Sequence, residues 1–345
     1  MPLVLHVDSD RWRDHLRSTW NPDIVPVAKG NGYGFGNHRL FAEARALGAR
    51  TVAVGTYFEV PADPREDVVV LSPWRPFLEV PQSKNVIHTV SRLADLVSIP
   101  AGSRVLIEVM TSMRRHGIGA RELRHTMLLN ALDRIKFEGW SLHFPMGAGG
   151  TSANLREAQE LGKAAEAVRR GTLWVSHVPA QKLADIGPDV KLRMGTGLWL
   201  GDRGALTVRA TVLDVHSVRR GERVGYRQRR VSGDGHILIV SGGTAHGVGL
   251  EAPTAAASVR QRAIAMAKGS LDAAGMALSP FSIEGKQRWF AEPPHMQASM
   301  LFLPSSVAPP AVGDEVDLDV RYTTTTFDRP DVSALPPRSS CPKKL

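Results

Sequence analysis

The sequence predicts an α/β protein with an N-terminal (β/α)8 barrel of the TIM type and a C-terminal, mostly β domain. Two observations support this. Over residues 1–203, short apolar runs alternate with helix-length stretches, as parallel strands and their connecting helices do. Over residues 204–330, strand-like runs follow one another with turn residues between them, which is typical of an antiparallel fold. We expect residues 331–345 to form a flexible tail.

The barrel is expected from eight apolar runs, most of them followed by a helix-length stretch. The runs lie at residues 24–28, 51–55, 68–72, 85–90, 104–109, 140–144, 173–178 and 191–195. Clear helical patterns occupy 38–48 and 152–171, and the second ends in basic residues and a glycine, as helix C-termini often do. Because periodicity cannot show closure, a doubly wound open sheet is the alternative.

The second domain is expected from five strand-like runs, which one helical pattern at residues 257–271 interrupts. The runs lie at residues 205–218, 222–230, 236–243, 298–304 and 314–327. A domain of this kind has room for several hairpins joined by turns rich in glycine, serine and aspartate.

The composition is that of a cytoplasmic globular protein. Of 345 residues, 43% are hydrophobic and 22% are charged, no apolar run is long enough to cross a membrane, and the single cysteine, Cys341, has no internal partner. The net charge of +9 comes mostly from scattered arginines without interleaved aromatics. We therefore expect small anionic metabolites as partners, and neither nucleic acid nor membrane. We also expect no metal site.

The segment VPVAKGNGYGFG, residues 25–36, places Lys29 at the end of an apolar strand and follows it with glycines. A lysine at the carboxyl end of a barrel strand lies where such enzymes carry out chemistry. Partial burial and nearby cations would leave its amine neutral and nucleophilic. The glycines would let a bulky planar cofactor approach, and Tyr33 offers a hydroxyl to a phosphate. A simple strand-to-helix turn with a solvated lysine is the alternative for this segment taken alone.

This segment resembles the cofactor-lysine motif of the alanine racemase family, the fold-type III pyridoxal-phosphate enzymes. The resemblance implies that Lys29 binds pyridoxal 5′-phosphate covalently and that Tyr33 faces its phosphate. Phe35 stands where the family usually has histidine. Further segments resemble the family in consistent order over residues 20–320, and such agreement is more specific than any single motif.

Two of these segments imply residues near the cofactor ring. VMTSMRRHGIG, residues 109–119, resembles the family's arginine segment, which gives Arg115 the role of binding the substrate carboxylate, although Met110 replaces the usual aspartate. EGWSLHFP, residues 138–145, resembles the segment whose histidine lies by the ring and bonds the catalytic tyrosine, which implies this role for His143.

Two more segments imply contacts to the phosphate and the ring nitrogen. They are WVSHVPAQKL (174–183) and LRMGTGLWLGD (192–202). Either Ser176 or His177 would contact the phosphate, and the alignment leaves both open. Arg193 would face the pyridine nitrogen, while the backbone amides of Gly195 and Thr196 would hold phosphate. An arginine there cannot hand over its proton, which favours return of a proton to the substrate carbon.

The β-rich domain supplies the remaining resemblances. GERVGYRQR, residues 221–229, aligns Tyr226 with the family's second acid/base, which reaches the active site of a partner subunit. EPPHMQASMLFLP, residues 292–304, aligns Met296 with the substrate-entry methionine and Gln297 with its neighbouring aspartate. Because a free tyrosine has a pKa near ~10, we expect arginines and His143 to supply positive charge near Tyr226.

The resemblance implies a homodimeric isomerase, an alanine racemase that makes D-alanine for biosynthesis through Lys29 and Tyr226 as two bases. Alanine is the first expected substrate, with serine or a larger amino acid possible. A decarboxylase is one alternative, although family decarboxylases use a cysteine in the site. A non-catalytic pyridoxal-phosphate carrier or regulator is another, although such proteins usually lack a second domain.

Overall fold

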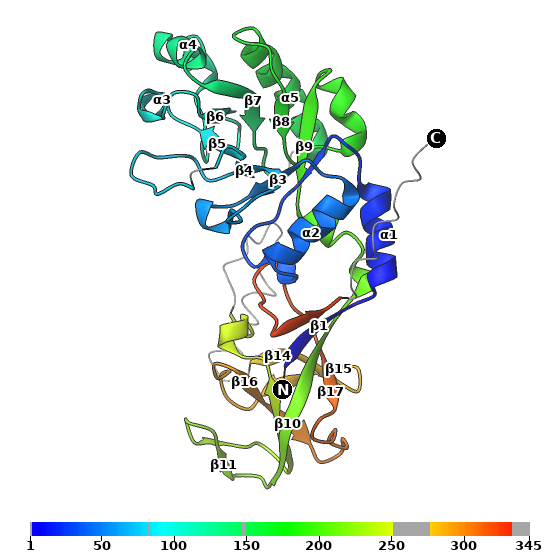
Figure 1. Ribbon diagram of the computed structural model, residues 1–345. Helices are drawn as coiled ribbons and strands as arrows, with labels where there is room; N and C mark the ends of the chain where they lie inside the picture. The colour runs from blue at the N-terminus through cyan, green and yellow to red at the C-terminus, as the bar shows by residue number, and fades with distance from the viewer. Residues whose placement is uncertain (1, 82, 147–149, 251–276, 333–345) are drawn as a thin grey trace, which may run out of the picture. The chain divides into compact units, whose positions relative to one another are not determined.

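The computed structural model describes residues 2–81, 83–146, 150–250 and 277–332, which form two compact units (Figure 1). The barrel unit contains residues 13–201, and the β-rich unit contains residues 2–12 together with the described chain from residue 202 onward. The helix expected at 257–271, Cys341 and the chain from residue 333 lie outside the described residues.

Eight parallel strands form the barrel, in the order β2-β9-β8-β7-β6-β5-β4-β3. The strands are β2 (Ile24–Pro26), β3 (Thr51–Val54), β4 (Asp67–Val70), β5 (Val86–Val90), β6 (Arg104–Val109), β7 (Lys136–Leu142), β8 (Leu173–Val175) and β9 (Val190–Met194). A parallel bridge between Val27 and Ala53 joins the two ends of this sheet. The predicted (β/α)8 barrel is therefore confirmed, rather than the open doubly wound sheet.

One apolar layer fills the barrel, and each residue of this layer is buried. Its members are Val25, Val27, Ala53, Val69, Ile87, Leu106 and Trp174. Burial of each large side chain stabilises the fold by roughly 1.5–3 kcal/mol. Since alternate residues of a strand face the same side, the residues two positions further along face the carboxyl end of the barrel interior. Those positions include Lys29, Gly55, Glu108 and Ser176, together with Leu71 and Thr89.

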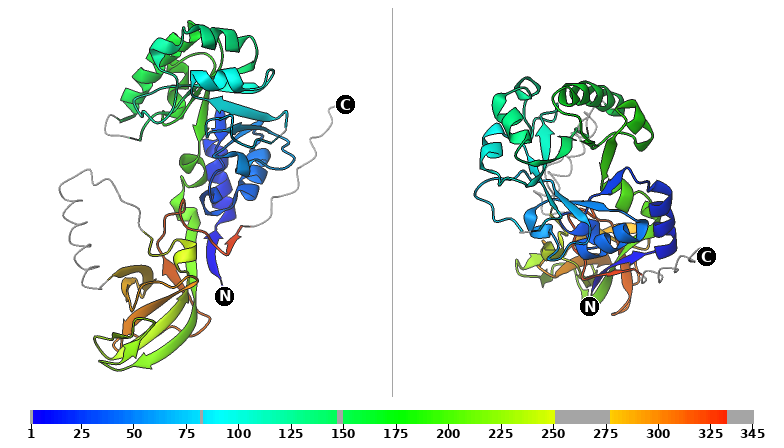
Figure 2. Two further views of the ribbon diagram at one scale, coloured as in Figure 1. Left: turned by 90° about the vertical axis from the view of Figure 1, so that its left-hand side faces the viewer. Right: turned by 45° about the horizontal axis from the view of Figure 1, so that its top comes forward.

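The helices of the barrel unit lie outside its ring of strands (Figure 2). The helices of the described chain are α1 (Ser9–Thr19), α2 (Asn37–Leu47), α3 (Leu93–Ser98), α4 (Thr126–Leu132), α5 (Gly150–Glu166) and α6 (Thr196–Trp199). The two predicted helices are confirmed as α2 and α5. Gly48 ends α2 in a left-handed conformation, φ 88°, and its amide donates to the carbonyls of Ala44 and Arg45. The predicted extension of α5 to Gly171 is wrong, because the chain returns there to β8, where Thr172 O accepts from Trp140 N at 2.9 Å.

A sheet that is antiparallel except for the parallel pair of β1 and β18 forms the β-rich unit. It closes on itself, because β10 pairs with both β17 and β13. Its strands are β1 (Leu3–Val7), β10 (Leu206–Val218), β13 (Gly235–Ser241), β14 (Leu278–Ile283), β15 (Lys286–Phe290), β16 (Ala298–Pro304), β17 (Glu315–Leu318) and β18 (Arg329–Asp331). A separate hairpin joins β11 (Arg223–Val224) to β12 (Arg229–Arg230). The predicted mostly β domain is confirmed.

The first strand belongs to the β-rich unit, whereas the expected first domain included residues 1–203. β1 runs antiparallel to β10, with Leu3 opposite Ala210, and its apolar side chains are buried there. The hairpin of β14 and β15 was also not expected from the sequence. Its turn consists of Glu284 and Gly285, both at positive φ, the backbone that tight antiparallel hairpins require.

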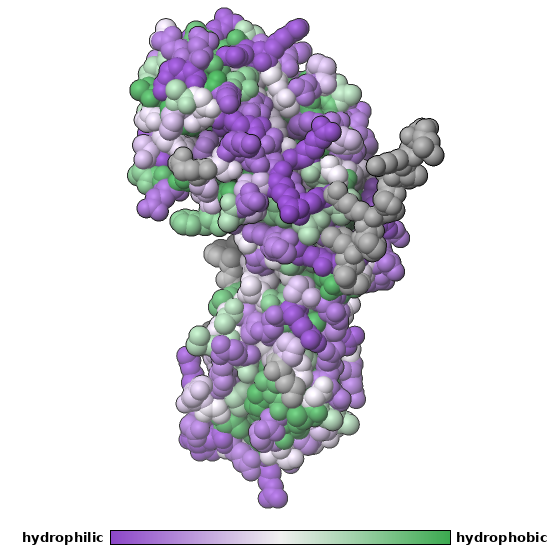
Figure 3. All heavy atoms as spheres, viewed as in Figure 1, coloured by the Kyte–Doolittle hydropathy of each residue, from purple (hydrophilic) through white to green (hydrophobic). Residues whose placement is uncertain are grey.

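The surface differs between the two units on the face drawn in Figure 3. The β-rich unit shows a group of apolar side chains there, whereas the barrel unit shows mostly hydrophilic ones. In the part of the chain that the structure describes, no helix combines the length and apolar character needed to cross a membrane.

Candidate active site

Lys29 lies three residues after the end of β2, at the carboxyl end of the barrel. Val27 N donates to Met194 O at 2.9 Å and Ala28 N donates to Ala53 O at 2.8 Å, so the backbone is fixed up to the residue before Lys29. Lys29 is in contact with solvent, but its neighbours shield part of the side chain from water. This partial burial lowers the pKa of Lys29. The Arg115 and Arg193 charges lower it further, and Glu59 opposes them. This environment favours a neutral amine.

The glycine-rich loop places the Tyr33 ring in the interior, with 5% of the residue exposed. Tyr33 has φ 56°, a left-handed conformation that costs a non-glycine residue about 1–3 kcal/mol. Its hydroxyl lies against Gly195, where an added Cβ would come within 2.0 Å of it. Burial, and next the Glu59 charge, raises the pKa of Tyr33 to about 12, so the phenol stays a hydrogen-bond donor at neutral pH.

Glu59 ties the lysine loop to the end of β3, and sequence reasoning missed it. It ends the short 3-10 helix Tyr57–Glu59, and its carboxylate accepts from the amides of Gly30, Gly55 and Thr56 at 2.7, 2.6 and 3.1 Å. The sequence did carry a signal, because Thr56 followed three residues later by Glu59 is a capping box. A negative charge is thereby held beside an otherwise cationic site.

Arg115 lies on a loop that leaves β6 and returns to it. Met110 N donates to Ile118 O at 2.9 Å, and Ile118 N donates to the carbonyl of the last but one residue of β6 at 2.8 Å. Ser112 is bound through its amide and hydroxyl to the Glu157 carboxylate on α5, at 2.5 and 2.6 Å. The Arg115 charge reaches the predicted site, because it lowers the pKa of Lys29.

His143 and Ser176 form a hydrogen-bonded pair at the ends of β7 and β8. Ser176 Oγ lies 2.8 Å from His143 Nδ1 and accepts from Phe144 N at 3.3 Å. Ser176 is buried, whereas His177 is exposed and its ring packs edge-on against His143 at 5.4 Å. The Ser176 hydroxyl is therefore hydrogen-bonded to His143. Of the two residues expected to contact the phosphate, Ser176 and His177, only His177 is exposed.

The charge state of His143 differs from the expectation. Burial, followed by the Arg193 and Arg115 charges, lowers the pKa of His143 to about 3, so the imidazole is neutral at neutral pH. The expectation that His143 supplies positive charge is therefore wrong. The causes are burial and, after it, the cationic surroundings, both of which make a charge on this ring unfavourable. A neutral imidazole can still donate or accept a hydrogen bond.

Arg193 is buried in the barrel interior and is only partly satisfied. One terminal nitrogen donates to Leu142 O at 2.9 Å and to Trp174 O at 3.2 Å, while Nε has no hydrogen-bond partner within the described chain. Burial lowers the pKa of Arg193 to about 10, with Glu108 opposing and Arg115 assisting, so the guanidinium stays charged at neutral pH. A buried donor without a partner indicates a group that completes the site.

Glu108 is a buried carboxyl on β6 that sequence reasoning also missed. It is 4% exposed, and its Oε2 has no hydrogen-bond partner among the described residues. Burial raises the pKa of Glu108, while the charges of Arg193, Arg115 and Arg75 oppose this rise. The only signal in the sequence was one acidic residue near the end of the apolar run RVLIEV.

The predicted residues of the β-rich unit lie on exposed loops of that unit. Tyr226 occupies the turn between β11 and β12 and is 85% exposed. Met296 is 65% exposed and precedes β16, next to Gln297, whose carbonyl accepts from Gly242 N at 2.9 Å. Exposed tyrosine and methionine side chains of this kind are common at protein–protein interfaces.

Comparisons with known proteins agree with this geometry. The family profile described as "Alanine racemase, N-terminal domain" matches residues 9–180. The chain belongs to the alanine racemase family. A search of curated protein sequences found no match.

Solved alanine racemase structures share the fold. The E. faecalis enzyme has a TM-score of 0.67 at 20% identity and covers 92% of this chain and 88% of its own. The biosynthetic enzyme of Pseudomonas aeruginosa has a TM-score of 0.67 at 16% identity, with coverage of 96% and 99%. The enzyme of D-cycloserine-producing Streptomyces lavendulae has a TM-score of 0.63 at 18% identity, with coverage of 92% and 87%. Relative to these alanine racemases, the chain is a divergent member of the family.

Alanine racemase family members use pyridoxal 5′-phosphate, and the donor set at the barrel end fits that group. Arg115 and Arg193 are cations beside which an anionic phosphate and a carboxylate are favourable. The unpaired Nε of Arg193 can donate to a ring nitrogen, and the protonated Tyr33 phenol can donate to a phosphate oxygen. The phenol occupies the position beside Gly195 that a Cβ would need, so glycine is what lets Tyr33 lie there.

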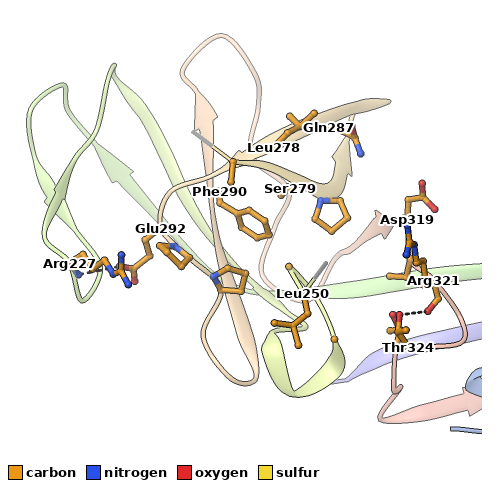
Figure 4. A pocket seen from close by; sticks show the side chains of 18 of the residues that line it. Arg227, Leu250, Leu278, Ser279, Gln287, Phe290, Glu292, Asp319, Arg321 and Thr324 are labelled. Atoms are coloured by element: carbon orange, nitrogen blue, oxygen red, sulfur yellow. Dashed lines mark hydrogen bonds between the residues drawn. The ribbon is translucent and has the colours of Figure 1, made fainter. Parts of the chain in front are cut away.

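The hollow in Figure 4 lies entirely within the β-rich unit, so it is separate from this donor set. Arg227 and Glu292 lie at one end of it, and Asp319 and Arg321 lie at the other. Its walls include Leu250 and Ala277, the residues that flank the segment 251–276, and that segment lies outside the described chain. We therefore assign no ligand to this hollow.

Proposed function

We propose that the chain is a pyridoxal 5′-phosphate-dependent amino-acid racemase that interconverts L- and D-alanine or a related amino acid. The observation that carries the proposal is the lowered pKa of Lys29 at the carboxyl end of a family barrel, beside Arg115 and Arg193. A lysine in such surroundings is suited to covalent cofactor binding and to proton transfer.

The residues at the barrel end have distinct parts in holding the cofactor. When bound through Lys29, pyridoxal 5′-phosphate withdraws electrons from the substrate and so makes its Cα proton more acidic. Tyr33 would donate to the phosphate from a phenol that stays protonated, with Gly195, Thr196 and either Ser176 or His177 beside it. Because the Ser176 hydroxyl is bound to His143, we favour His177 for the phosphate contact.

Arg193 would face the pyridine nitrogen through its unpaired Nε. With a pKa of about 10 it remains protonated at neutral pH, so it donates a hydrogen bond and keeps its proton. This limits the electron withdrawal by the ring and favours return of a proton to the same carbon over loss of the amino group. Arg115 would bind the substrate carboxylate through its planar fork of N–H donors.

Inversion requires proton transfer on both faces of the substrate carbon, which one side chain cannot provide. We propose that Lys29 moves the proton of the D enantiomer and that Tyr226 of a second copy moves that of the L enantiomer. The exposure of Tyr226 supports its use by a partner subunit and hence a homodimer. His143, held neutral and oriented by Ser176, would hydrogen bond the tyrosine hydroxyl. Each acid/base group of this kind contributes about 10²–10⁴-fold to the rate.

The substrate entrance is the least family-like part of the proposed site. Met296 would border it, and Gln297 stands where the family motif has aspartate. Replacement of a carboxylate by an amide removes a charge, so the accepted side chain can differ from that of alanine. A cytoplasmic setting and a role in D-alanine biosynthesis belong to this proposal.

The test is a panel of twenty L-amino acids incubated with cofactor-loaded protein in deuterated water, followed by chiral analysis. We expect one or a few amino acids to gain deuterium at Cα and to appear as the D enantiomer. Lys29→Ala should abolish both the reaction and the visible absorption of the bound cofactor. Release of carbon dioxide would indicate a decarboxylase instead, and cofactor absorption without turnover would indicate a carrier or regulator.

A further inference from the structure

The turn that carries Tyr226 is built on a buried carboxylate. Glu292, 2% exposed, accepts from Tyr226 N at 3.1 Å through Oε1 and from Arg227 N at 3.3 Å through Oε2. Gly225 has φ +72°, and an added Cβ would lie 2.1 Å from the Glu292 carboxylate. The peptide groups on both sides of Tyr226 Cα are therefore fixed to the same carboxylate, that of Glu292.

His295 connects this carboxylate to the Tyr226 ring. His295 Nε2 lies 2.5 Å from Glu292 Oε1, where it donates to the carboxylate. The two aromatic rings of His295 and Tyr226 are 4.6 Å apart between centroids and inclined by 48°. The backbone of His295 is fixed too, since its amide donates to Ala298 O and its carbonyl accepts from Thr244 N.

The charge of Glu292 is consistent with this arrangement. Burial alone would raise the pKa of Glu292, but the hydrogen bonds from His295 and from the Arg227 and Tyr226 amides lower it overall. A carboxylate that accepts several hydrogen bonds stays ionised and holds its donors firmly.

We propose that Glu292 and His295 are positioning residues that hold the Tyr226 phenol ready for proton transfer. The inference rests on the proposed function of Tyr226 and extends it to two residues to which the resemblances described above assign no role. A tyrosine on an exposed turn would otherwise lose side-chain freedom in each reaction cycle, which costs conformational entropy. A ring already fixed in place avoids this cost, and displacement of a reacting group by ~1 Å can lower a rate by about 10²-fold.

The experiment measures exchange against inversion for the D enantiomer of the amino acid that the wild-type chain racemises. In deuterated water, Lys29 alone can exchange the Cα proton, whereas formation of the L enantiomer also requires Tyr226. We expect His295→Ala and Glu292→Gln to raise the ratio of exchange to inversion about tenfold or more. A general loss of fold or cofactor would lower both rates and leave their ratio unchanged.

Variants within the same unit sharpen the result. His295→Phe keeps ring packing but loses the bond to Glu292, so it should restore part of the inversion that His295→Ala loses. If Glu292→Gln does not fold, His295→Phe still tests the bond between His295 and Glu292. The matched control is His216→Ala, which removes a histidine beside an acidic side chain, Asp214, on the exposed part of β10. It should leave the ratio unchanged.

A second measurement is independent of turnover. With 3-fluorotyrosine in place of the four tyrosines, the fluorine resonance of Tyr226 is identified by its loss in Tyr226→Phe. His295→Ala should shift this resonance towards that of the free amino acid, and His216→Ala should not. The inference would be overturned if His295→Ala left the resonance of Tyr226 unmoved. It would also be overturned if His295→Ala and Glu292→Gln left the ratio of exchange to inversion unchanged while Tyr226→Phe raised it. Either result would leave the proposed function intact. If Tyr226→Phe racemises normally, the two-base function and the inference both fall.

Discussion

The Glu59 carboxylate accepts a 2.7 Å hydrogen bond from the amide of Gly30, the residue that directly follows Lys29. The same carboxylate binds two amides at the end of β3, so the proposed catalytic lysine is fixed to the neighbouring strand by one side chain. Its charge also opposes the lowering of the Lys29 pKa.

Glu59→Gln should therefore change both stability and titration. An amide group has one acceptor oxygen, so at least one of the three backbone donors loses its partner, which costs about 1–3 kcal/mol. Removal of the negative charge should lower the pKa of Lys29 further. Chemical denaturation measures the first effect, and NMR of 13C-methylated lysine measures the second. As a control, Glu122→Gln, where the carboxylate caps only Gly119, should leave Lys29 titrating as in the wild type.

Acid should destabilise the barrel unit through His143. Its folded pKa of about 3 lies below the ordinary 6.5, so between these pH values the unfolded chain binds a proton that the folded chain does not. Stability therefore falls as the pH is lowered from 6.5 towards 3, by at most about 1.4 kcal/mol per pH unit for this group. Denaturation of His143→Gln from pH 7 to pH 4 should show a shallower slope. The same slope in both proteins would contradict the neutral imidazole, and His38→Gln, at an exposed position of α2, provides the control.

Gly195→Ala should destabilise the fold because its new Cβ would meet the Tyr33 hydroxyl at 2.0 Å. Overpacking of this kind costs about 1–3 kcal/mol. Tyr33→Phe removes the closest contact, so the double variant should recover part of the loss, and a double-mutant cycle measures the coupling. Strictly additive changes would show that the two residues do not meet.

Tyr33→Phe alone should weaken binding of pyridoxal 5′-phosphate about tenfold, as expected for one lost hydrogen bond to a charged group.

Glu108→Gln should make the fold more stable at neutral and alkaline pH. Because burial raises the folded pKa of Glu108, stability from this group is present below its ordinary pKa and is lost as the pH rises through the folded value. The amide has no such titration, so the difference in unfolding free energy should grow in favour of the variant as the pH rises from the ordinary glutamate pKa to the folded pKa of Glu108, and should stay constant above it. A variant that is instead destabilised at high pH would show that Arg193 depends on an ionised Glu108.

The barrel and its lysine were predictable because both are local patterns. Apolar runs at regular spacing indicate the strands, and VPVAKGNGYGFG contains the lysine, the tight turn and the tyrosine within twelve residues. Glu59 could have been suspected from its capping box, but its bond to Gly30 spans 29 residues, and no local pattern indicates such a contact.

The supports of Tyr226 could not be predicted for the same reason. Glu292 meets Tyr226 N across 66 residues, and His295 stacks on the ring only because the chain between them folds back. The neutral state of His143 likewise depends on burial by the surrounding barrel and on the charges of Arg193 and Arg115, which come from distant parts of the sequence. These contacts and this charge state depend on which residues lie close together in the folded chain. The sequence alone gives only the type and order of the residues.

The strand β1 has a consequence for the order in which the chain folds. Its amide at Leu3 donates to the Asp328 carboxylate at 2.7 Å, across 325 residues, and its antiparallel partner β10 begins at Leu206. During synthesis at the ribosome, the barrel strands emerge well before these partners exist. β1 therefore has no antiparallel partner until β10 has been made, and it lacks the Asp328 carboxylate until almost all of the described chain has appeared. Contacts of such long range are slow to form. A chaperone that shields residues 3–7 during this interval would raise the yield of folded protein without touching the site.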